Sequence, residues 1–150
     1  MKKSKISKLI EIIFKLMLIG GTICLFILPK LYNLFSIEGT PDFNNQTILY
    51  QITFYLCYII CLLIIFFLAK IFNHIYQDSP FTKLIEKTLK IIAILFMSLS
   101  LIVFIKTIFI PTIISLAVVL ITFIVSLCFY VLSQIFKIAI IHKDELDYTI

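Results

Sequence analysis

The chain has 150 residues, of which 62% are hydrophobic, and its mean hydropathy is +1.16. A single domain of this length cannot bury so much apolar surface, so the composition excludes a soluble globular protein. The formal charge is +5, and all thirteen basic residues are lysines. The lack of arginine argues against direct nucleic-acid binding, where bidentate guanidinium contacts are favoured. We therefore expect a single domain that is embedded in the lipid bilayer.

Four apolar segments are about as long as a bilayer is thick. An α-helix rises about 1.5 Å per residue, so about 20 residues cross a hydrocarbon core of roughly 30 Å. The expected spans are residues 9–28, 48–70, 88–110 and 112–136. Lipid cannot satisfy backbone amides, and these segments are apolar on every side, so they are expected to be helices and not barrel strands. The predicted fold is an all-α antiparallel bundle of four transmembrane helices.

The first segment begins as an amphipathic helix. Ile10 and Phe14 lie on its apolar face, while Glu11 and Lys15 form a favourable pair on the opposite face. No small-x-small cleavage site precedes Pro29, so we interpret this segment as an uncleaved first helix and not as a signal peptide. The double glycine at residues 20–21 is expected to let a neighbouring helix approach closely, with a bend as the alternative.

The second segment is expected to continue past the bilayer into a helical hairpin. Tyr50 and Tyr55 lie near its outer end, as in an aromatic belt. The helical pattern persists to about residue 77, and Ser79 is predicted to cap the third helix, with Pro80 at its first position. The connection between the second and third spans is therefore expected to be helical and basic on its wet side.

Lys106 marks the outer end of the third span, where its stem can reach the headgroups. The fourth span carries small hydroxyl residues at intervals of seven, four and seven along one stripe: Ser115, Thr122, Ser126 and Ser133. We interpret the stripe as a helix-packing surface, with the lining of a polar substrate path as the alternative. The fourth helix is expected to end near Ile141, before an acidic tail.

Lysine placement predicts the orientation. Lysine-rich segments lie before residue 10, between residues 70 and 90 and after residue 136, whereas residues 30–47 and the connection at Lys106 hold one lysine each. An excess of lysine is typical of cytoplasmic segments. We therefore expect a multi-pass protein of the bacterial cell membrane with both termini in the cytoplasm.

The sequence offers little chemistry inside the spans. Their central parts lack Asp, Glu, His and Arg, and no zinc-protease, nucleophile-elbow or P-loop motif occurs. We expect no catalytic residue, no cofactor and no metal. A weaker alternative is a metal site in which His74 and His142 combine with Asp78 or Asp144. Four cysteines fall inside the spans and are expected to pack as small hydrophobes, with metal or redox roles as the alternative: Cys24, Cys57, Cys61 and Cys128.

Two segments carry a resemblance to a known family. The first is Asp78-Ser79-Pro80-Phe81-Thr82, and the second runs from Gln134-Ile135-Phe136-Lys137 to the acidic end Lys143-Asp144-Glu145-Leu146-Asp147-Tyr148-Thr149-Ile150. With its four-span layout, the chain resembles the DUF2975 family of small bacterial membrane proteins. It departs from that pattern at Tyr148, where leucine is usual. The resemblance implies four helices, an uncharacterised function, and frequent encoding beside a short helix-turn-helix regulator of the Cro/C1 type.

The resulting hypothesis is a non-catalytic membrane protein that controls such a regulator through its cytoplasmic face. The expected partner surface combines the basic hairpin and the acidic tail: Phe81, Lys83, Lys87, Lys90, Asp144, Glu145 and Asp147. An equal alternative is that the tail pairs with the hairpin lysines of its own chain. Two other functions fit the composition. One is immunity or stress protection against a membrane-active peptide, and the other is a small transporter or channel subunit that forms a homo-oligomer.

Overall fold

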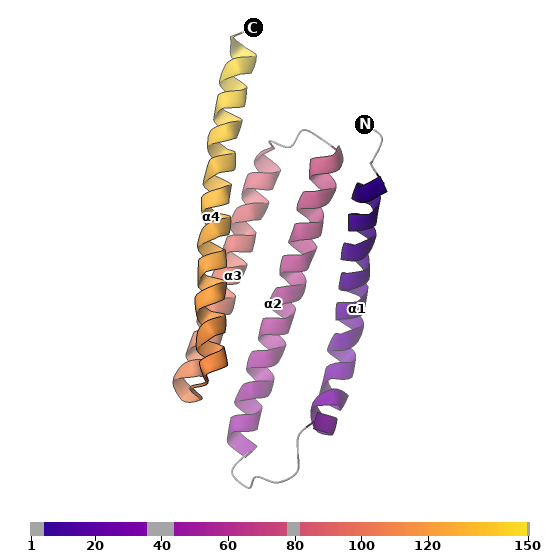
Figure 1. Ribbon diagram of the computed structural model, residues 1–150, viewed down its shortest axis with the longest axis vertical. Coiled ribbons are helices and arrows are strands. Elements are labelled where there is room, and N and C mark those ends of the chain that lie inside the picture. Colours follow the sequence, from indigo (N-terminus) through magenta and orange to yellow (C-terminus); the bar gives the residue numbers. More distant parts are fainter. Residues whose placement is uncertain (1–4, 36–43, 78–81, 150) are drawn as a thin grey trace.

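The computed structural model describes residues 5–35, 44–77 and 82–149, and it contains four α-helices joined in antiparallel succession (Figure 1). Their bounds are Lys5–Phe35 for α1, Asn44–Gln77 for α2, Lys83–Phe109 for α3 and Ile113–Tyr148 for α4. Each helix contains a segment long and apolar enough to cross a membrane. The prediction of an all-helical protein with four such segments is confirmed.

The helices extend beyond the expected spans. The first continues through Pro29 to Phe35, and α2 already begins at Asn44. The prediction that the last helix ends near Ile141 is wrong, because α4 continues to Tyr148. The tail contains neither glycine nor proline, and its Lys, Glu and Leu residues are good helix formers, so nothing in it ends the helix earlier. At the helical rise, α4 is about 54 Å long.

The four helices form an open row and not a closed bundle. Contacts join only helices that follow one another in the chain: α1 with α2, α2 with α3, and α3 with α4. No Cα atoms within 8 Å of each other link α1 to α3 or α4 in the described ranges, and Figure 1 shows α1 and α4 at opposite ends of the row. The antiparallel order of the helices agrees with the prediction, but the helices do not close into a bundle. In lipid no hydrophobic force draws helices together, so an open row carries no penalty for its apolar faces.

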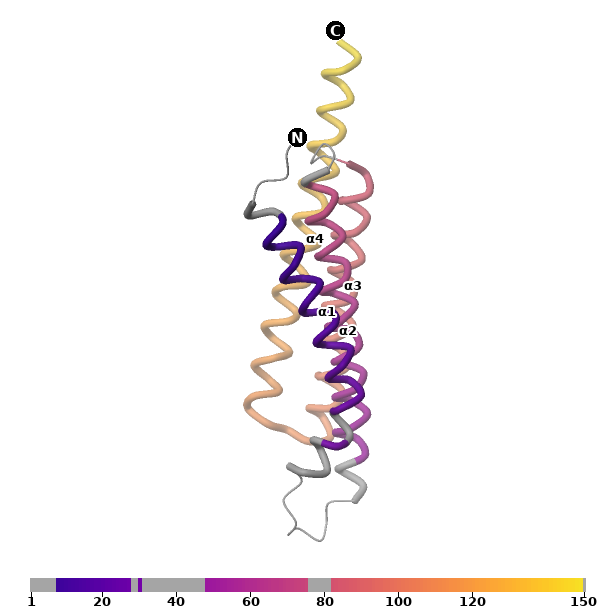
Figure 2. Tube along the Cα trace, turned by 90° about the vertical axis from the view of Figure 1, so that its right-hand side faces the viewer, coloured from indigo at the N-terminus to yellow at the C-terminus, as the bar shows by residue number. Residues whose placement is uncertain are grey.

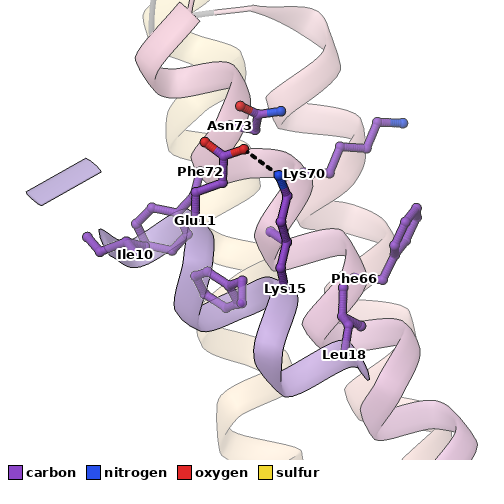
Figure 3. Close-up of a pocket in the computed structure, with 10 residues that line it drawn as sticks. Ile10, Glu11, Lys15, Leu18, Phe66, Lys70, Phe72 and Asn73 are labelled. Atoms are coloured by element: carbon purple, nitrogen blue, oxygen red, sulfur yellow. Dashed lines mark hydrogen bonds and ion pairs between the residues drawn. The ribbon is translucent and has the colours of Figure 1, made fainter. Parts of the chain in front are cut away.

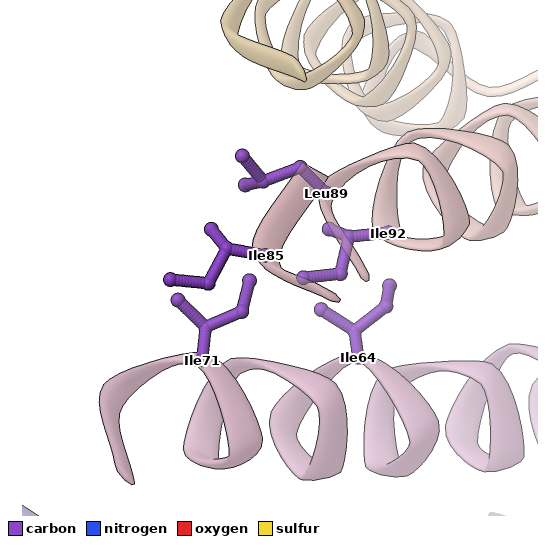
Figure 4. Close-up of a cluster of buried hydrophobic side chains, with 5 residues drawn as sticks. All are labelled: Ile64, Ile71, Ile85, Leu89 and Ile92. Carbon is purple, nitrogen blue, oxygen red and sulfur yellow. The ribbon is translucent and has the colours of Figure 1, made fainter. Parts of the chain in front are cut away.

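The buried core lies between α2 and α3. Figure 4 shows two α2 side chains, Ile64 and Ile71, facing Ile92 and Ile85 of α3, with Leu89 of the same cluster farther from α2. Two aromatic residues of α4 pack against this cluster, and the ring of one of them, Phe129, stacks on Phe96 at 5.6 Å. Most remaining apolar side chains are exposed, including Ile113 at 90% and Phe26 at 80%. Such surfaces are compatible with contact to lipid on both faces of the row.

The first helix approaches α2 closely at Gly21. The Tyr58 hydroxyl donates a hydrogen bond to the Gly21 carbonyl oxygen at 2.7 Å. A Cβ atom on Gly21 would lie 2.5 Å from a Leu62 methyl, whereas Gly20 has no neighbour within 4 Å. The expected packing role is thus confirmed for Gly21, and Gly20 faces open space.

Candidate interaction surface at the lysine-rich end

Along the helix axes the row has a lysine-rich end and an opposite end, which differ sharply in lysine content. One end is formed by the start of α1, the end of α2, the start of α3 and the end of α4. The halves of the helices nearer this end carry Lys5, Lys8, Lys15, Lys70, Lys83, Lys87, Lys90, Lys137 and Lys143. The helices carry only Lys30 and Lys106 toward the opposite end. The alternation of lysine-rich and lysine-poor segments along the sequence therefore places most lysines at one end of the helices.

The basic hairpin presents two exposed lysines at the start of α3. Lys83 and Lys87 are exposed, while Lys90 is partly buried and forms an ion pair with Glu86 at 2.9 Å. Phe81, the fourth predicted hairpin residue, lies outside the described residues. The expected cap is wrong: Thr82, whose backbone is extended, is the N-cap of α3, and its side chain makes no capping hydrogen bond. Ser79 and Pro80 also lie outside the described residues.

The acidic end of α4 projects beyond the other helices (Figures 1 and 2). Asp144, Glu145 and Asp147 are all exposed. Two hydrogen bonds between α3 and α4, described below, set their antiparallel register, which places Phe136 level with Lys83. Continuing the helical rise places Asp144 about 12 Å farther out.

The acidic end and the hairpin lysines are therefore not brought together. In the part of the chain that the structure describes, no ion pair joins an acidic residue of this end to Lys83, Lys87 or Lys90. Glu145 instead approaches His142 of its own helix, with 3.6 Å between carboxylate oxygen and Nδ1. Self-pairing of the tail, the alternative expected from the sequence, has no contact to support it among the described side chains.

The hydroxyl stripe of α4 lies in the interface with α3. Ser115, Thr122, Ser126 and Ser133 are all buried. The Ser126 hydroxyl donates to the Ala93 carbonyl oxygen at 2.8 Å, and in the reverse direction Ser100 of α3 donates to Val119 at 3.2 Å. The hydroxyls of Thr122 and Ser133 bond to carbonyls of α4 itself. Small side chains thus let α3 and α4 approach, and two hydroxyls link them directly.

Histidine and cysteine do not gather into a metal site. Among the residues described, no group of three or more His, Cys, Asp or Glu side chains could hold a metal ion. His74 lies on α2 and His142 on α4, and no Cα atoms of these two helices lie within 8 Å of each other in the described ranges. Cys24, Cys61 and Cys128 are exposed free thiols, so the expectation that the cysteines pack in the interior is wrong for these three. An open row has too little interior to enclose them.

A groove between α1 and α2 was not predicted from the sequence. Figure 3 shows its lining side chains, which enclose about 370 Å³. Its polar residues are Glu11, Lys15, Lys70 and Asn73, and its apolar part includes Phe14 and Phe66. Lys15 and Glu11 form the expected ion pair at 2.9 Å. The sequence reveals that pair because it lies within one helix, but the matching face of α2 depends on how the two helices dock.

A family model described as "Protein of unknown function (DUF2975)" matches residues 35–150. The matched region contains α2, α3 and α4 and leaves out nearly all of α1. The chain therefore belongs to the DUF2975 family, as its resemblance implied. No curated protein and no solved structure is similar enough to be a match.

Proposed function

We propose that this member of the DUF2975 family crosses the bacterial cell membrane four times with both ends in the cytoplasm. Four helices of sufficient length and the lysine asymmetry between the ends of the row support this orientation. In the membrane, the protein acts without catalysis, as an anchor that controls a small helix-turn-helix regulator of the Cro/C1 type.

The projecting acidic end of α4 is the observation that carries the proposal. With a length of about 54 Å, α4 exceeds a hydrocarbon core of roughly 30 Å by several turns. The cytoplasmic excess ends in Asp144, Glu145 and Asp147, all of which are exposed. The protein therefore holds a short acidic helix away from the membrane surface.

These acidic residues oppose the stability of the helix that carries them. The C-terminus of an α-helix carries partial negative charge, so a carboxylate in the last turns costs roughly 0.3–1 kcal/mol where it is exposed. The first turn of α4, where an acidic residue would stabilise the helix, has none. Side chains that oppose local stability are expected at functional positions. We therefore assign these carboxylates to the binding of a positively charged partner.

A DNA-binding regulator has the required chemistry. Such proteins carry a basic surface that contacts phosphates. An acidic helix that occupies this surface competes with DNA and keeps the regulator at the membrane. In this mechanism the membrane protein itself makes no contact with nucleic acid.

Capture of the regulator tests the proposal. Membrane vesicles that contain the full chain are incubated with a small helix-turn-helix regulator of the Cro/C1 type, and bound regulator is measured at increasing salt. We expect salt-sensitive binding that is lost when Asp144→Asn, Glu145→Gln and Asp147→Asn are combined. The control combines Lys83→Gln with Lys87→Gln, which changes exposed charge at the same end of the row. Binding that survives loss of the three carboxylates contradicts the mechanism.

The orientation is tested separately with reporters fused to each end of the chain. A reporter that is active only in the cytoplasm is expected to work at both ends, and opposite results at the two ends would refute the four-span arrangement.

The alternatives have less support. The transporter hypothesis used the hydroxyl stripe as a path, but Ser126 and Ser133 are buried against neighbouring helix surface. Immunity against a membrane-active peptide requires no particular site, and no feature of the helix row favours it over an anchor. Altered sensitivity of a deletion strain to such peptides, with the regulator absent, would favour the immunity hypothesis.

A further inference from the structure

The groove between α1 and α2 is polar at one end and apolar along its length. Lys15 and Lys70 provide positive charge at its lysine-rich end (Figure 3). Phe14 and Phe66 line its apolar part. About one turn beyond Leu18 along α1, the hydrogen bond from Tyr58 to Gly21 joins the two helices. The same polarity, a charged head on an apolar body, is the chemical signature of a phospholipid.

The two lysines lie at the depth of lipid headgroups if the chain crosses the membrane as proposed. Lys70 directly follows the uncharged segment from Ile48 to Ala69, which is about 33 Å long as a helix and thus matches the hydrocarbon core. The rings of Phe14 and Phe72, whose centroids are 5.3 Å apart, set Lys15 of α1 at nearly the same level. Both ammonium groups are therefore within reach of lipid phosphates.

The charge of the groove favours an anionic lipid. Its two lysines outnumber its single carboxylate, Glu11, which already contacts Lys15. The Lys15 side chain is 68% exposed, and an ammonium group has three donors, so it can bind Glu11 and a phosphate together. Lys70 is exposed and extends outward from α2 in Figure 3, and its flexible stem can bring the ammonium group over the groove.

We propose that this groove binds an anionic phospholipid of the cytoplasmic leaflet. Its phosphate lies between Lys15 and Lys70, and the upper part of one acyl chain lies along Phe14, Leu18 and Phe66. Basic sites between transmembrane helices on the cytoplasmic side are suited to anionic headgroups. The inference rests on the proposed membrane crossing but not on the proposed regulator. A second protein helix is a poorer occupant, because a single helical turn, about 10 Å wide and about 5.4 Å long, already fills more than the groove volume of about 370 Å³.

Native mass spectrometry of the full chain, released from nanodiscs of equal phosphatidylglycerol and phosphatidylethanolamine content, tests this site. We expect retained phosphatidylglycerol to exceed phosphatidylethanolamine. Lys15→Gln and Lys70→Gln should each lower phosphatidylglycerol retention about fivefold, since a lysine near the membrane surface contributes about 1 kcal/mol. Lys83→Gln is the matched control, because it removes an exposed lysine at the same end but outside the groove.

A second variant tests the apolar part without a change in charge. Ala69→Leu places a larger side chain in the groove and should lower retention of both lipids, while the helical circular dichroism signal keeps its wild-type value. A photo-crosslinking residue at position 69 should form adducts with lipid.

Several results would overturn the lipid site. They are equal retention of the two lipids, equal loss in Lys83→Gln and Lys70→Gln, or adducts from position 69 with protein and none with lipid. The two proposals fail with different results. If the chain is absent from the membrane fraction, both the membrane crossing and the lipid site are refuted. A chain in the membrane that captures the regulator but retains no phosphatidylglycerol removes the lipid site alone.

Discussion

Gly21→Val should weaken the attachment of α1 to α2. The added Cβ would lie 2.5 Å from a Leu62 methyl, whereas an ordinary contact between carbon atoms is about 3.5–4.0 Å. Leu62 must therefore move by about 1 Å, and the branched valine leaves few rotamers that relieve the contact. Overpacking of this kind costs about 1–3 kcal/mol, and loss of the Tyr58 hydrogen bond adds about 0.6 kcal/mol. We expect the free energy of unfolding to fall by about 1.6–3.6 kcal/mol.

Unfolding in mixed micelles with increasing dodecyl sulfate, followed by circular dichroism, measures this effect. The adjacent substitution Gly20→Val is the matched control, since nothing lies within 4 Å of a Cβ at Gly20. Gly21→Ala should cost less than about 1 kcal/mol, because the opposing atom is the end of a flexible side chain. If Gly20→Val and Gly21→Val destabilise the protein equally, the contact with Leu62 does not hold α1 in place and the reasoning fails.

Three further predictions concern the other helix contacts, each measured by the same unfolding assay. Ser126→Ala should lower the free energy of unfolding by about 0.6 kcal/mol, because it removes the hydrogen bond to Ala93. Ser98→Ala removes only a bond within α3 and should leave the free energy of unfolding almost unchanged. Equal losses in the two variants would contradict a role of Ser126 in helix docking. Ile92→Ala in the core should cost about 2–5 kcal/mol, and Ile94→Ala, at 67% exposure on the same helix, far less. Lys106→Met should cost about 0.5–2 kcal/mol, since its ammonium nitrogen lies 4.5 Å from the centroid of the Tyr50 ring, and this cost should vanish in a Tyr50→Leu background.

Features that depend on neighbours along the chain could be predicted from the sequence. Helix type and number follow from apolar length, and the Glu11–Lys15 and Glu86–Lys90 pairs follow from spacing within one helix. The end of α4 was predicted too early, because a charged tail suggests solvent exposure but does not stop a helix.

Features that depend on how helices meet could not be predicted. Segments that are apolar on every side give no periodic signal for the face that packs, so the open row and the α1–α2 groove had no signature. The hydroxyl stripe was visible, because polar residues stand out from an apolar background, but its partner on α3 was not. Tyr50 and Lys106 were each expected near the outer boundary, and only the docking of α2 with α3 shows that they meet.

The unequal docking of the helices indicates which part of the molecule carries its stability. The core and the hydroxyl seam join α2, α3 and α4, and these helices lie within the region that the family model matches. In contrast, no described side chain of α1 is buried, although α1 meets α2 at Gly21 and at the Phe14–Phe72 ring contact. A lipid in the groove would add contacts where α1 has few of its own. If the proposed lipid occupies the groove, its binding energy would help to hold α1 in place, whereas the packing of α2, α3 and α4 does not depend on it.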